Sequence, residues 1–93
     1  MDVQVLKADY ANPDHAQSLV NLLDAYASDP MGGGEGLSAH VRQNLVAALS
    51  DTPEAFSILA IIEGTAVGLV NCFQGFSTFA CKPLINIHDV FVL

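Results

Sequence analysis

The segment Leu84-Ile85-Asn86-Ile87-His88-Asp89-Val90-Phe91-Val92-Leu93 is the part of the sequence that decides the fold. Its β-branched and aromatic residues predict a β-strand. Apolar residues alternate with Asn86, His88 and Asp89, which indicates a strand in the middle of a sheet whose polar side chains face a site. Because no turn, cap or polar tail follows the strand, we expect the chain to be interrupted beside that site.

The composition is acidic and unusually apolar for so short a chain. The 93 residues are 52% hydrophobic and 14% charged, with a mean hydropathy of +0.42. A chain of this length suits one domain with a small core, and we expect some of its apolar surface to lack cover. The net charge of −7 disfavours nucleic acid and anionic membranes as partners and favours a cationic ligand.

Residues 56–76 have the length and apolarity of a membrane span, but the sequence favours another structure. Glu63-Gly64-Thr65 interrupts the segment with a charge and a turn residue, which predicts a buried hairpin. The start of the chain carries Asp2 and no signal-peptide pattern, so we expect a cytoplasmic location. Cys72 and Cys81 have no Cys or His at metal-ligand spacing, so we expect no metal site and two free, buried thiols.

The first third of the chain predicts a strand followed by a helix. In residues 2–9, Val3, Val5 and, less regularly, Ala8 alternate with polar neighbours, which predicts a short first strand. Asn12-Pro13-Asp14 predicts the start of a helix, with Asn12 as its N-cap, and Asp29-Pro30 predicts its end. The expected buried stripe of this helix has three-and-four spacing and consists of Ala16, Leu19, Val20, Leu23, Tyr26 and Ala27.

The segment 31–36 contains four glycines. Gly32-Gly33-Gly34 invites interpretation as a phosphate-binding loop, but such a loop follows a strand and precedes a helix that begins with Lys and Ser or Thr. Here a helix precedes the glycines and no Lys follows them. We therefore predict a mobile connection between two helices, with a substrate-side lid as an alternative use of that mobility.

A second helix and a hairpin follow. Ser38 predicts the N-cap of a helix that extends to Leu49, and its expected buried side consists of Val41, Leu45, Ala48 and Leu49. Residues 55–62 and 66–76 predict an antiparallel hairpin. Within the second arm, Gly68 indicates a bulge or a close approach of two backbones.

This order predicts an α+β fold of the type β-α-α-β-β-β. Its simplest form is a mostly antiparallel four-stranded sheet with two helices on one face. Because two short helices cannot cover both faces, we expect one face or the edge of the last strand to be bare.

The order of elements resembles the N-terminal half of a GCN5-related N-acetyltransferase, a member of the GNAT superfamily. Residues 61–68 resemble the family's hairpin, and residues 87–92 resemble its fourth strand. The resemblance covers essentially the whole chain. It implies that residues 1–93 form a single truncated domain, the acceptor-side half of a GNAT domain.

The resemblance also implies acetyl-CoA as the co-substrate. Family members continue with Arg or Gln and x-x-Gly-x-Gly or Ala, whose backbone amides open a helix and bind the pyrophosphate of acetyl-CoA. That segment is not among the 93 residues, so we expect poor or no binding of acetyl-CoA to this chain alone. The pantetheine arm is expected to pair with the backbone of Val90, Phe91 and Val92, where an amide would stabilise the developing charge on the thioester oxygen.

His88 and Asp89 are the catalytic candidates that the resemblance implies. The amine acceptor must lose a proton, and an imidazole can accept one around neutral pH, whereas a carboxylate would act directly or through water. Two structural alternatives stay open: His88 hydrogen-bonded into the sheet face, and Asp89 accepting bonds from backbone amides or from a neighbouring loop. Adjacent strand residues point to opposite faces, so both can face one site only if the strand bulges.

Substrate-binding residues in this family tend to come from the first two helices and their connection. By this resemblance Tyr26, Asp29 and Glu35, with Asp24 nearby, are candidates for binding a small-molecule or peptide amine. Their carboxylates suit a cationic amine, and the alternative is a solvated acidic surface.

Two functions stay open at this point. The first is the N-terminal part of an N-acetyltransferase that transfers an acetyl group from acetyl-CoA to a primary amine by direct attack on the thioester, inactive as this fragment alone. The alternative is a small, non-enzymatic α+β interaction module that self-associates through its sheet. Both predict a homodimer or a strand-swapped oligomer.

Overall fold

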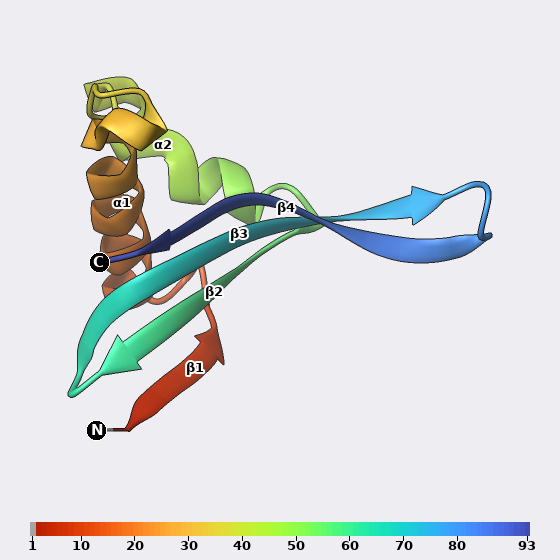
Figure 1. Ribbon diagram of the computed structural model, residues 1–93, viewed down its shortest axis with the longest axis horizontal. Helices are drawn as coiled ribbons and strands as arrows, with labels where there is room; N and C mark the ends of the chain where they lie inside the picture. The colour runs from red at the N-terminus through yellow and green to blue at the C-terminus, as the bar shows by residue number, and fades with distance from the viewer. Residues whose placement is uncertain (1) are drawn as a thin grey trace.

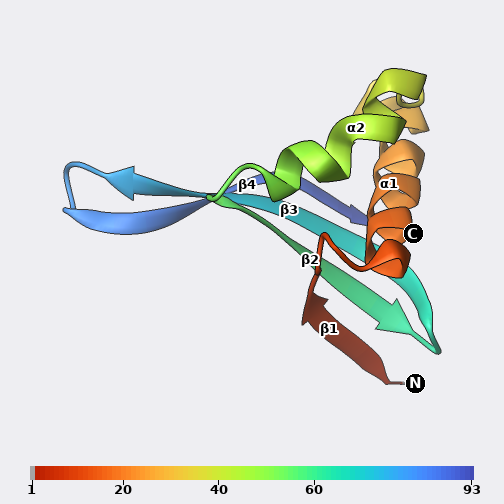
Figure 2. The same ribbon diagram turned by 180° about the vertical axis from the view of Figure 1, so that it is seen from behind.

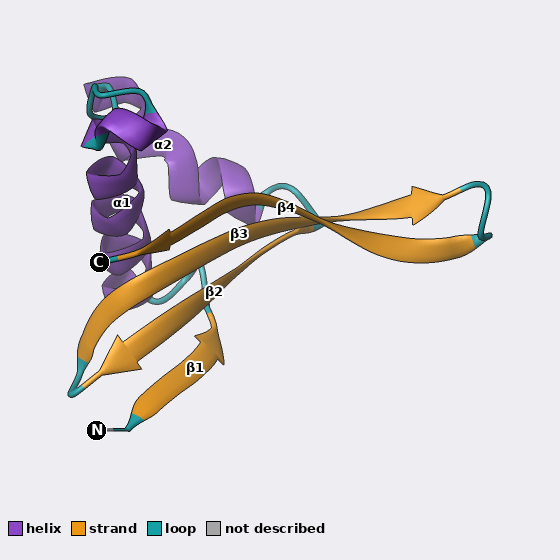
Figure 3. Ribbon diagram, in the orientation of Figure 1, coloured by secondary structure: helices purple, strands orange, loops and turns teal. Residues whose placement is uncertain are grey.

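The computed structural model describes residues 2–93 and contains one four-stranded sheet with two α-helices. Along the chain the elements are β1 (Val3–Lys7), α1 (Pro13–Ser28), the short 3-10 helix η1 (Pro30–Gly32), α2 (Ala39–Ser50), β2 (Ala55–Ile62), β3 (Thr65–Ser77) and β4 (Lys82–Val92). The strands lie side by side in the order of the sequence, and every neighbouring pair is antiparallel (Figures 1 and 3). The predicted α+β fold and its element order are confirmed.

Both helices begin where the capping residues predict. Asn12 Oδ1 accepts hydrogen bonds from the amides of Asp14 and His15, at 2.9 and 3.3 Å, and Pro13 fills the first turn of α1. Ser38 Oγ accepts a bond from the amide of Val41 at the start of α2. These side chains satisfy amides that have no partner inside the helix, which is why the helix starts are readable from the sequence.

The core lies between the helices and one face of the sheet. It consists of Ala8, Leu19, Val20, Leu22, Leu49, Leu59 and Leu69. The predicted first strand is present as β1, in which Val3 and Val5 are 56% and 66% exposed whereas Leu6 packs against the core and Ala8, just after the strand, is buried. Alternation with a period of two identifies two faces but does not say which one a helix will cover.

The helix stripes also need correction at three positions. In α1, Leu22 is buried although the predicted stripe leaves it out. In α2, Ala48 is exposed, whereas Val46 packs against the core in its place. Spacing identifies the apolar side of a helix, whereas the contacts of that helix with the sheet decide which residues of this side are buried.

The second face of the sheet is uncovered. Both helices lie on one side of the sheet, as the two opposite views show (Figures 1 and 2). Exposed apolar side chains on the other side come from both outer strands, and they are Val3, Val5, Ile85, Ile87, Val90 and Val92. The expectation of one bare face is confirmed for the described residues.

The β2–β3 hairpin has the turn and the irregularity that its glycines predict. Glu63 and Gly64 form the turn with positive φ angles of 50° and 79°. In the ladder Ala60 pairs with Gly68 and Ile61 with Ala66, so that Val67 is the extra residue of a β-bulge. The predicted bulge is therefore confirmed beside Gly68, where an added Cβ would lie 3.2 Å from the Cβ of Ala60 and 3.6 Å from the carbonyl oxygen of Phe91.

The outer part of β3 and β4 extends beyond the helices as a two-stranded arm (Figure 1). The tip of the arm carries Phe79, which is fully exposed, and Cys81, which is exposed with a φ of 55°. The prediction of two free thiols is confirmed, but burial holds only for Cys72. Cys81 lies in the turn between the strands, where no helix packs. Within the part of the chain that the structure describes, no helix is long and apolar enough to span a membrane.

Candidate functional site

A β-bulge in β4 decides how His88 and Asp89 are oriented. Asn71 pairs with Asp89 and Cys72 with Ile87, which leaves His88 as the extra residue. The His88 ring lies edge-on against Phe73, with ring centroids 4.6 Å apart, and Phe73 packs against the core on the helix side of the sheet. Asp89 also faces this side, because it is hydrogen-bonded to Asn71, which lies two residues from buried Leu69.

The bulge therefore fulfils the condition under which both residues can face one site. Without the extra residue, His88 and Asp89 would point to opposite faces of the sheet. His88 is exposed, and Asp89 is half-buried beside it. The hydrogen bond that the structure gives to the Asp89 carboxylate comes from the Asn71 side chain rather than from a backbone amide. Their catalytic roles stay predictions.

Asp89 ends a row of hydrogen-bonded side chains that crosses the sheet. Asn71 Nδ2 lies 3.2 Å from Asp89 Oδ2, Ser57 Oγ lies 2.6 Å from Asn71 Oδ1, and the Tyr10 hydroxyl lies 2.9 Å from Ser57 Oγ. Ser57 and Asn71 are 0% and 4% exposed, so this polar row runs through the core. Ser57 is the strand partner of Asn71, and Asn71 is the partner of Asp89.

Sequence reasoning missed Ser57, Asn71 and Tyr10 as members of the site. A signal existed, because Ser57 and Asn71 each interrupt a long apolar strand, two residues from the core residues Leu59 and Leu69. A polar residue on the buried side of a strand needs a partner. Nothing in the sequence alone says which partner it has.

The predicted cofactor-binding strand lies at the edge of the sheet. Val90, Phe91 and Val92 pair on one side with Val70, Leu69 and Gly68 of β3. In the described residues no strand pairs with the other side of β4, so the expectation of a central strand is wrong for this chain. Half of the backbone groups of an edge strand point outward, where an extended ligand can pair with them. That use of residues 90–92 stays a prediction.

Tyr26 is the predicted substrate residue that the fold brings closest to β4. Its ring packs against Phe91, with centroids 5.7 Å apart and an interplanar angle of 49°. Phe91 is partly buried on the helix side, whereas Val90 and Val92 are exposed on the bare side. The contact joins the last turns of α1 to the strand that carries Asp89.

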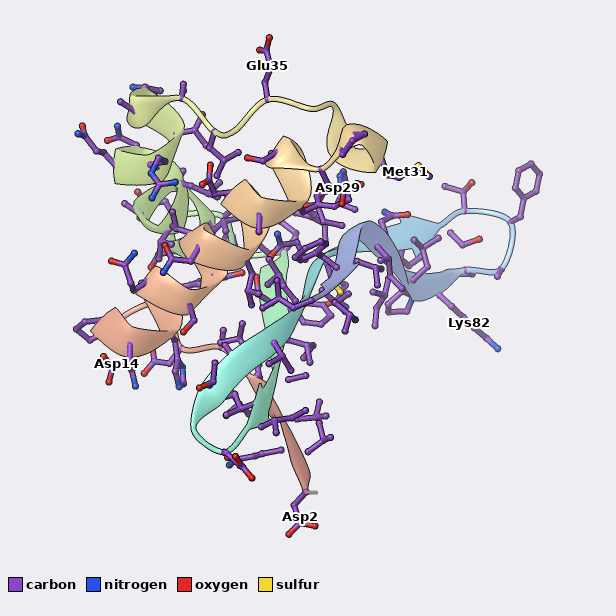
Figure 4. The ribbon with its side chains drawn as sticks, turned by 60° about the vertical axis from the view of Figure 1, so that its left-hand side comes forward. Asp2, Asp14, Asp29, Met31, Glu35 and Lys82 are labelled. Atoms are coloured by element: carbon purple, nitrogen blue, oxygen red, sulfur yellow. The ribbon has the colours of Figure 1, made fainter. Side chains whose placement is uncertain are left out.

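The acidic candidates have structural partners or lie apart. Asp24 accepts a 2.8 Å bond from the amide of Leu37 and forms a 2.7 Å ion pair with Arg42, and these contacts lower the pKa of the Asp24 carboxyl. Asp29 Oδ1 accepts the amide of Met31 and caps η1. Glu35 is exposed and points away from the body of the molecule (Figure 4). A substrate role for Asp29 and Glu35 stays a prediction.

The three consecutive glycines have a structural reason. A Cβ on Gly32 would lie 1.9 Å from the carbonyl oxygen of Tyr26, so only glycine allows the segment to pack on the last turn of α1. Gly33 and Gly34 have φ angles of 116° and 82°, a region that favours glycine. Close packing and positive φ angles therefore account for the three glycines without a bound phosphate. The mobility of this connection stays a prediction.

The structure describes no metal-binding cluster in residues 2–93, since no three or more His, Cys, Asp or Glu side chains gather in an arrangement that could hold an ion. The polar side chains gathered near β4 are the Asp89 carboxylate, the His88 imidazole, the Asn71 amide and the hydroxyls of Ser57 and Tyr10.

No protein-family model matches the chain, and a search of curated proteins gives no significant match. Solved structures do share its fold. A ribosomal-protein-alanine N-acetyltransferase from Brucella melitensis biovar Abortus 2308 matches with a TM-score of 0.73 and 16% identity over 99% of this chain and 57% of its own. A GNAT family acetyltransferase from Staphylococcus aureus matches with 0.74 and 13%, over 99% of this chain and 63% of its own.

An aminoglycoside acetyltransferase from an uncultured soil metagenomic sample, solved in complex with sisomicin, matches with a TM-score of 0.72 and 18% identity. The match covers 97% of this chain and 55% of that protein. The chain thus spans little more than half the length of the acetyltransferases it matches. At these identities the likeness shows the fold, and the predicted resemblance to the N-terminal part of a GNAT acetyltransferase is confirmed at that level.

Proposed function

We propose that this chain is the N-terminal, acceptor-side part of an acetyl-CoA-dependent N-acetyltransferase. The observation that supports this most directly is the bulge at His88, because it turns two groups able to accept a proton toward one face of the strand expected to carry the co-substrate. The shared fold with acetyltransferases supports the same reading. The missing part of the domain would then lie in sequence outside these 93 residues.

In this proposal each part of the site has a separate task. The outward edge of residues 90–92 pairs with the extended arm of acetyl-CoA, which supplies the activated acetyl group. The Asp89 carboxylate and the His88 imidazole receive the acceptor amine, hold its proton and leave the nitrogen lone pair free to attack. Tyr26, packed on Phe91, forms the wall between the acceptor and α1.

The acceptor we propose is a primary amine, with a cationic amine preferred. The net charge of −7 attracts cations to the molecule as a whole. An acetyltransferase of the same fold carries an aminoglycoside, sisomicin, in its solved structure. Because the two proteins are only 18% identical, this neighbour serves only as an example of an acceptor that the fold can bind.

The decisive test begins with the gene sequence beyond Leu93. We expect codons for a basic residue followed by closely spaced glycines, and the longer product should release CoA from acetyl-CoA in the presence of a panel of amines. Asp89→Asn should lower kcat by about 10²-fold or more, since a positioned proton acceptor contributes that much. Calorimetry should give saturable binding of acetyl-CoA to the longer product and none in the micromolar range to residues 1–93. Tight binding to the 93-residue chain would contradict the proposed cofactor site.

The bare sheet face and the free edge of β4 favour a second candidate, a self-associating interaction module. It predicts a stop codon after Leu93 and a stable dimer of the natural protein. A longer open reading frame with acetyl-CoA-dependent activity would exclude it.

A further inference from the structure

The hydrogen-bonded row of Tyr10, Ser57, Asn71 and Asp89 places polar side chains in the core, which lowers the stability of so small a fold. Ser57 and Asn71 occupy buried positions in the middle of two strands that are otherwise apolar. Apolar side chains of similar shape would fill the same space without the cost of removing hydroxyl and amide groups from water. Positions where a chain departs from the local rule without gain in stability are where function is expected.

The direction of the hydrogen bonds along the row follows from its last member. An ionised carboxylate can only accept, so Asn71 must turn its Nδ2 toward Asp89 and its Oδ1 toward Ser57. Ser57 then donates its single hydroxyl proton to Asn71 and must accept from the Tyr10 hydroxyl. Each group thereby fixes the orientation of the next, from Tyr10 in the connection between β1 and α1 to Asp89 in β4.

The strand register makes the row rigid. Ser57 and Asn71 are direct cross-strand partners, as are Asn71 and Asp89. Directly opposite side chains in neighbouring strands are close enough to bond without stretching. The row ends at the residue next to the His88 bulge, so the regular ladder holds Asp89 while the irregularity turns His88 to the same side.

The hydrogen bond from Asn71 engages one oxygen of Asp89 and leaves the other. Asp89 Oδ2 is the acceptor for Asn71, and within residues 2–93 no hydrogen bond to Asp89 Oδ1 is formed. Ser57 and Asn71 are buried, whereas Asp89 and Tyr10, at the two ends of the row, are partly exposed. The Asp89 carboxylate is therefore the end of the row that meets the surface at β4. A carboxylate held at one oxygen presents the other in a defined direction.

Resting on the proposed function, we infer that Asn71 is a positioning residue that acts through Asp89. Asn71, held in turn by Ser57 and Tyr10, fixes the Asp89 carboxylate so that its Oδ1 receives the ammonium group of the acceptor. His88 lies outside the row, since its contact is with the Phe73 ring. The acceptor anchor of this site is therefore Asp89.

The structural part of the inference is tested on the 93-residue chain by NMR. The side-chain amide of Asn71, assigned by its loss in Asn71→Leu, should shift when Asp89→Asn removes the carboxylate and stay in place in the matched control His88→Gln. An unchanged chemical shift of the Asn71 amide in Asp89→Asn would overturn the inference, because the two side chains would then not be hydrogen-bonded in solution.

The functional part is tested by a double-mutant cycle on the longer gene product. Asn71→Leu should lower kcat/KM about tenfold through misplacement of the carboxylate. Asp89→Asn should lower it about 10²-fold, and the double variant should be no worse than Asp89→Asn within about twofold. Asn44→Leu, which makes the same change at an exposed position of α2, should leave kcat/KM unchanged. Effects that multiply in the double variant would mean that Asn71 does not act through Asp89.

Ser57→Ala covers the case in which Asn71→Leu does not fold, because it removes the hydroxyl that holds Asn71 Oδ1 and introduces no buried charge. We expect Ser57→Ala to lower kcat/KM several-fold in the wild-type background and to have no further effect in the Asp89→Asn background. An equal loss in both backgrounds would overturn the inference. If the wild-type longer product transfers no acetyl group to any amine, the proposed function itself fails, which differs visibly from an active enzyme with multiplying effects.

Discussion

Cys72 and Cys81 lie on the same hairpin in opposite surroundings. Cys72 in β3 is 5% exposed, and burial raises the pKa of its thiol. Cys81 is exposed in the turn at the tip of the arm. Since the thiolate is the reactive form and must be reached by the reagent, burial protects Cys72 twice, by access and by ionisation.

We therefore predict two well-separated rates of thiol modification. With a disulfide reagent near neutral pH, Cys81 should react at least about 10²-fold faster than Cys72, which is 5% exposed between its strand partners Phe56 and Ile87. The measurement is the time course of reagent release in the native chain. Cys81→Ser should abolish the fast phase, and urea should merge the two phases. Equal rates in the native chain would contradict the burial of Cys72.

At the scale of elements, the Asp24 carboxylate of α1 contacts both α2 and the connection between the two helices. Asp24 of α1 accepts the amide of Leu37 just before α2 and pairs with Arg42 within α2. Gly32 packs against the carbonyl of Tyr26 in the same region. These contacts connect the α1–α2 segment to the end of α1, whose Tyr26 contacts β4.

The lowered pKa of Asp24 gives this link a pH dependence. The amide of Leu37 and then the Arg42 guanidinium favour the ionised carboxyl, so its pKa in the folded chain lies below the unfolded value. The stabilisation is present above the unfolded pKa of about 4 and is lost as the pH falls through the folded value. Asp24→Asn keeps an acceptor for Leu37 but removes the charge.

The comparison to make is the urea midpoint of wild type and Asp24→Asn against pH. The wild type should be more stable from about pH 5 upward, and the difference should shrink as the pH falls below the unfolded pKa and disappear once the folded Asp24 carboxyl is protonated. Because the pair is partly exposed, added salt should reduce the difference. A difference that persists unchanged in acid would show that the charge of Asp24 plays no part.

At the scale of the whole molecule, the sheet face opposite the helices carries exposed apolar side chains. Val5, Ala60, Gly68 and Val92 form one cross-strand row on this face, which spans the sheet from β1 to β4. Val5 and Val92 are 66% and 69% exposed. An apolar face of this extent, with two free edge strands, favours pairing with a second copy or with further protein.

Adjacent residues of β1 separate association from stability. Val5→Lys places a charge on the bare face and should weaken self-association of the isolated chain while changing its unfolding free energy by no more than about 0.5 kcal/mol. Leu6→Lys, its matched control, directs the charge into the core and should cost about 2 kcal/mol or more. Sedimentation equilibrium and urea unfolding measure the two effects. Equal destabilisation by both variants would mean that the second face is covered in solution.

Much of the fold could be predicted because its signals are local. Asn12 and Ser38 cap helices through bonds to amides two or three residues away, and the Gly64 turn closes its hairpin between neighbouring strands. Gly68 marked its bulge for the same reason, since a missing side chain at a close approach is visible in the residue itself. Strand alternation and family resemblance point to His88 and Asp89 as candidates. Their orientation depends on the bulge at His88, which only the register of β3 and β4 reveals.

The sequence by itself determined the caps, the turns, the order of the elements and the excess of apolar residues over what two helices can cover. Only the tertiary structure decided that Leu6 rather than Val5 faces the core, that His88 is the extra residue of a bulge, and that Ser57, Asn71 and Asp89 stand in one bonded row. The two groups of features differ in how far apart along the chain the interacting residues lie. Capping and periodicity act within one or two turns of chain, whereas the choice of face and the cross-strand register depend on which distant segments pack together.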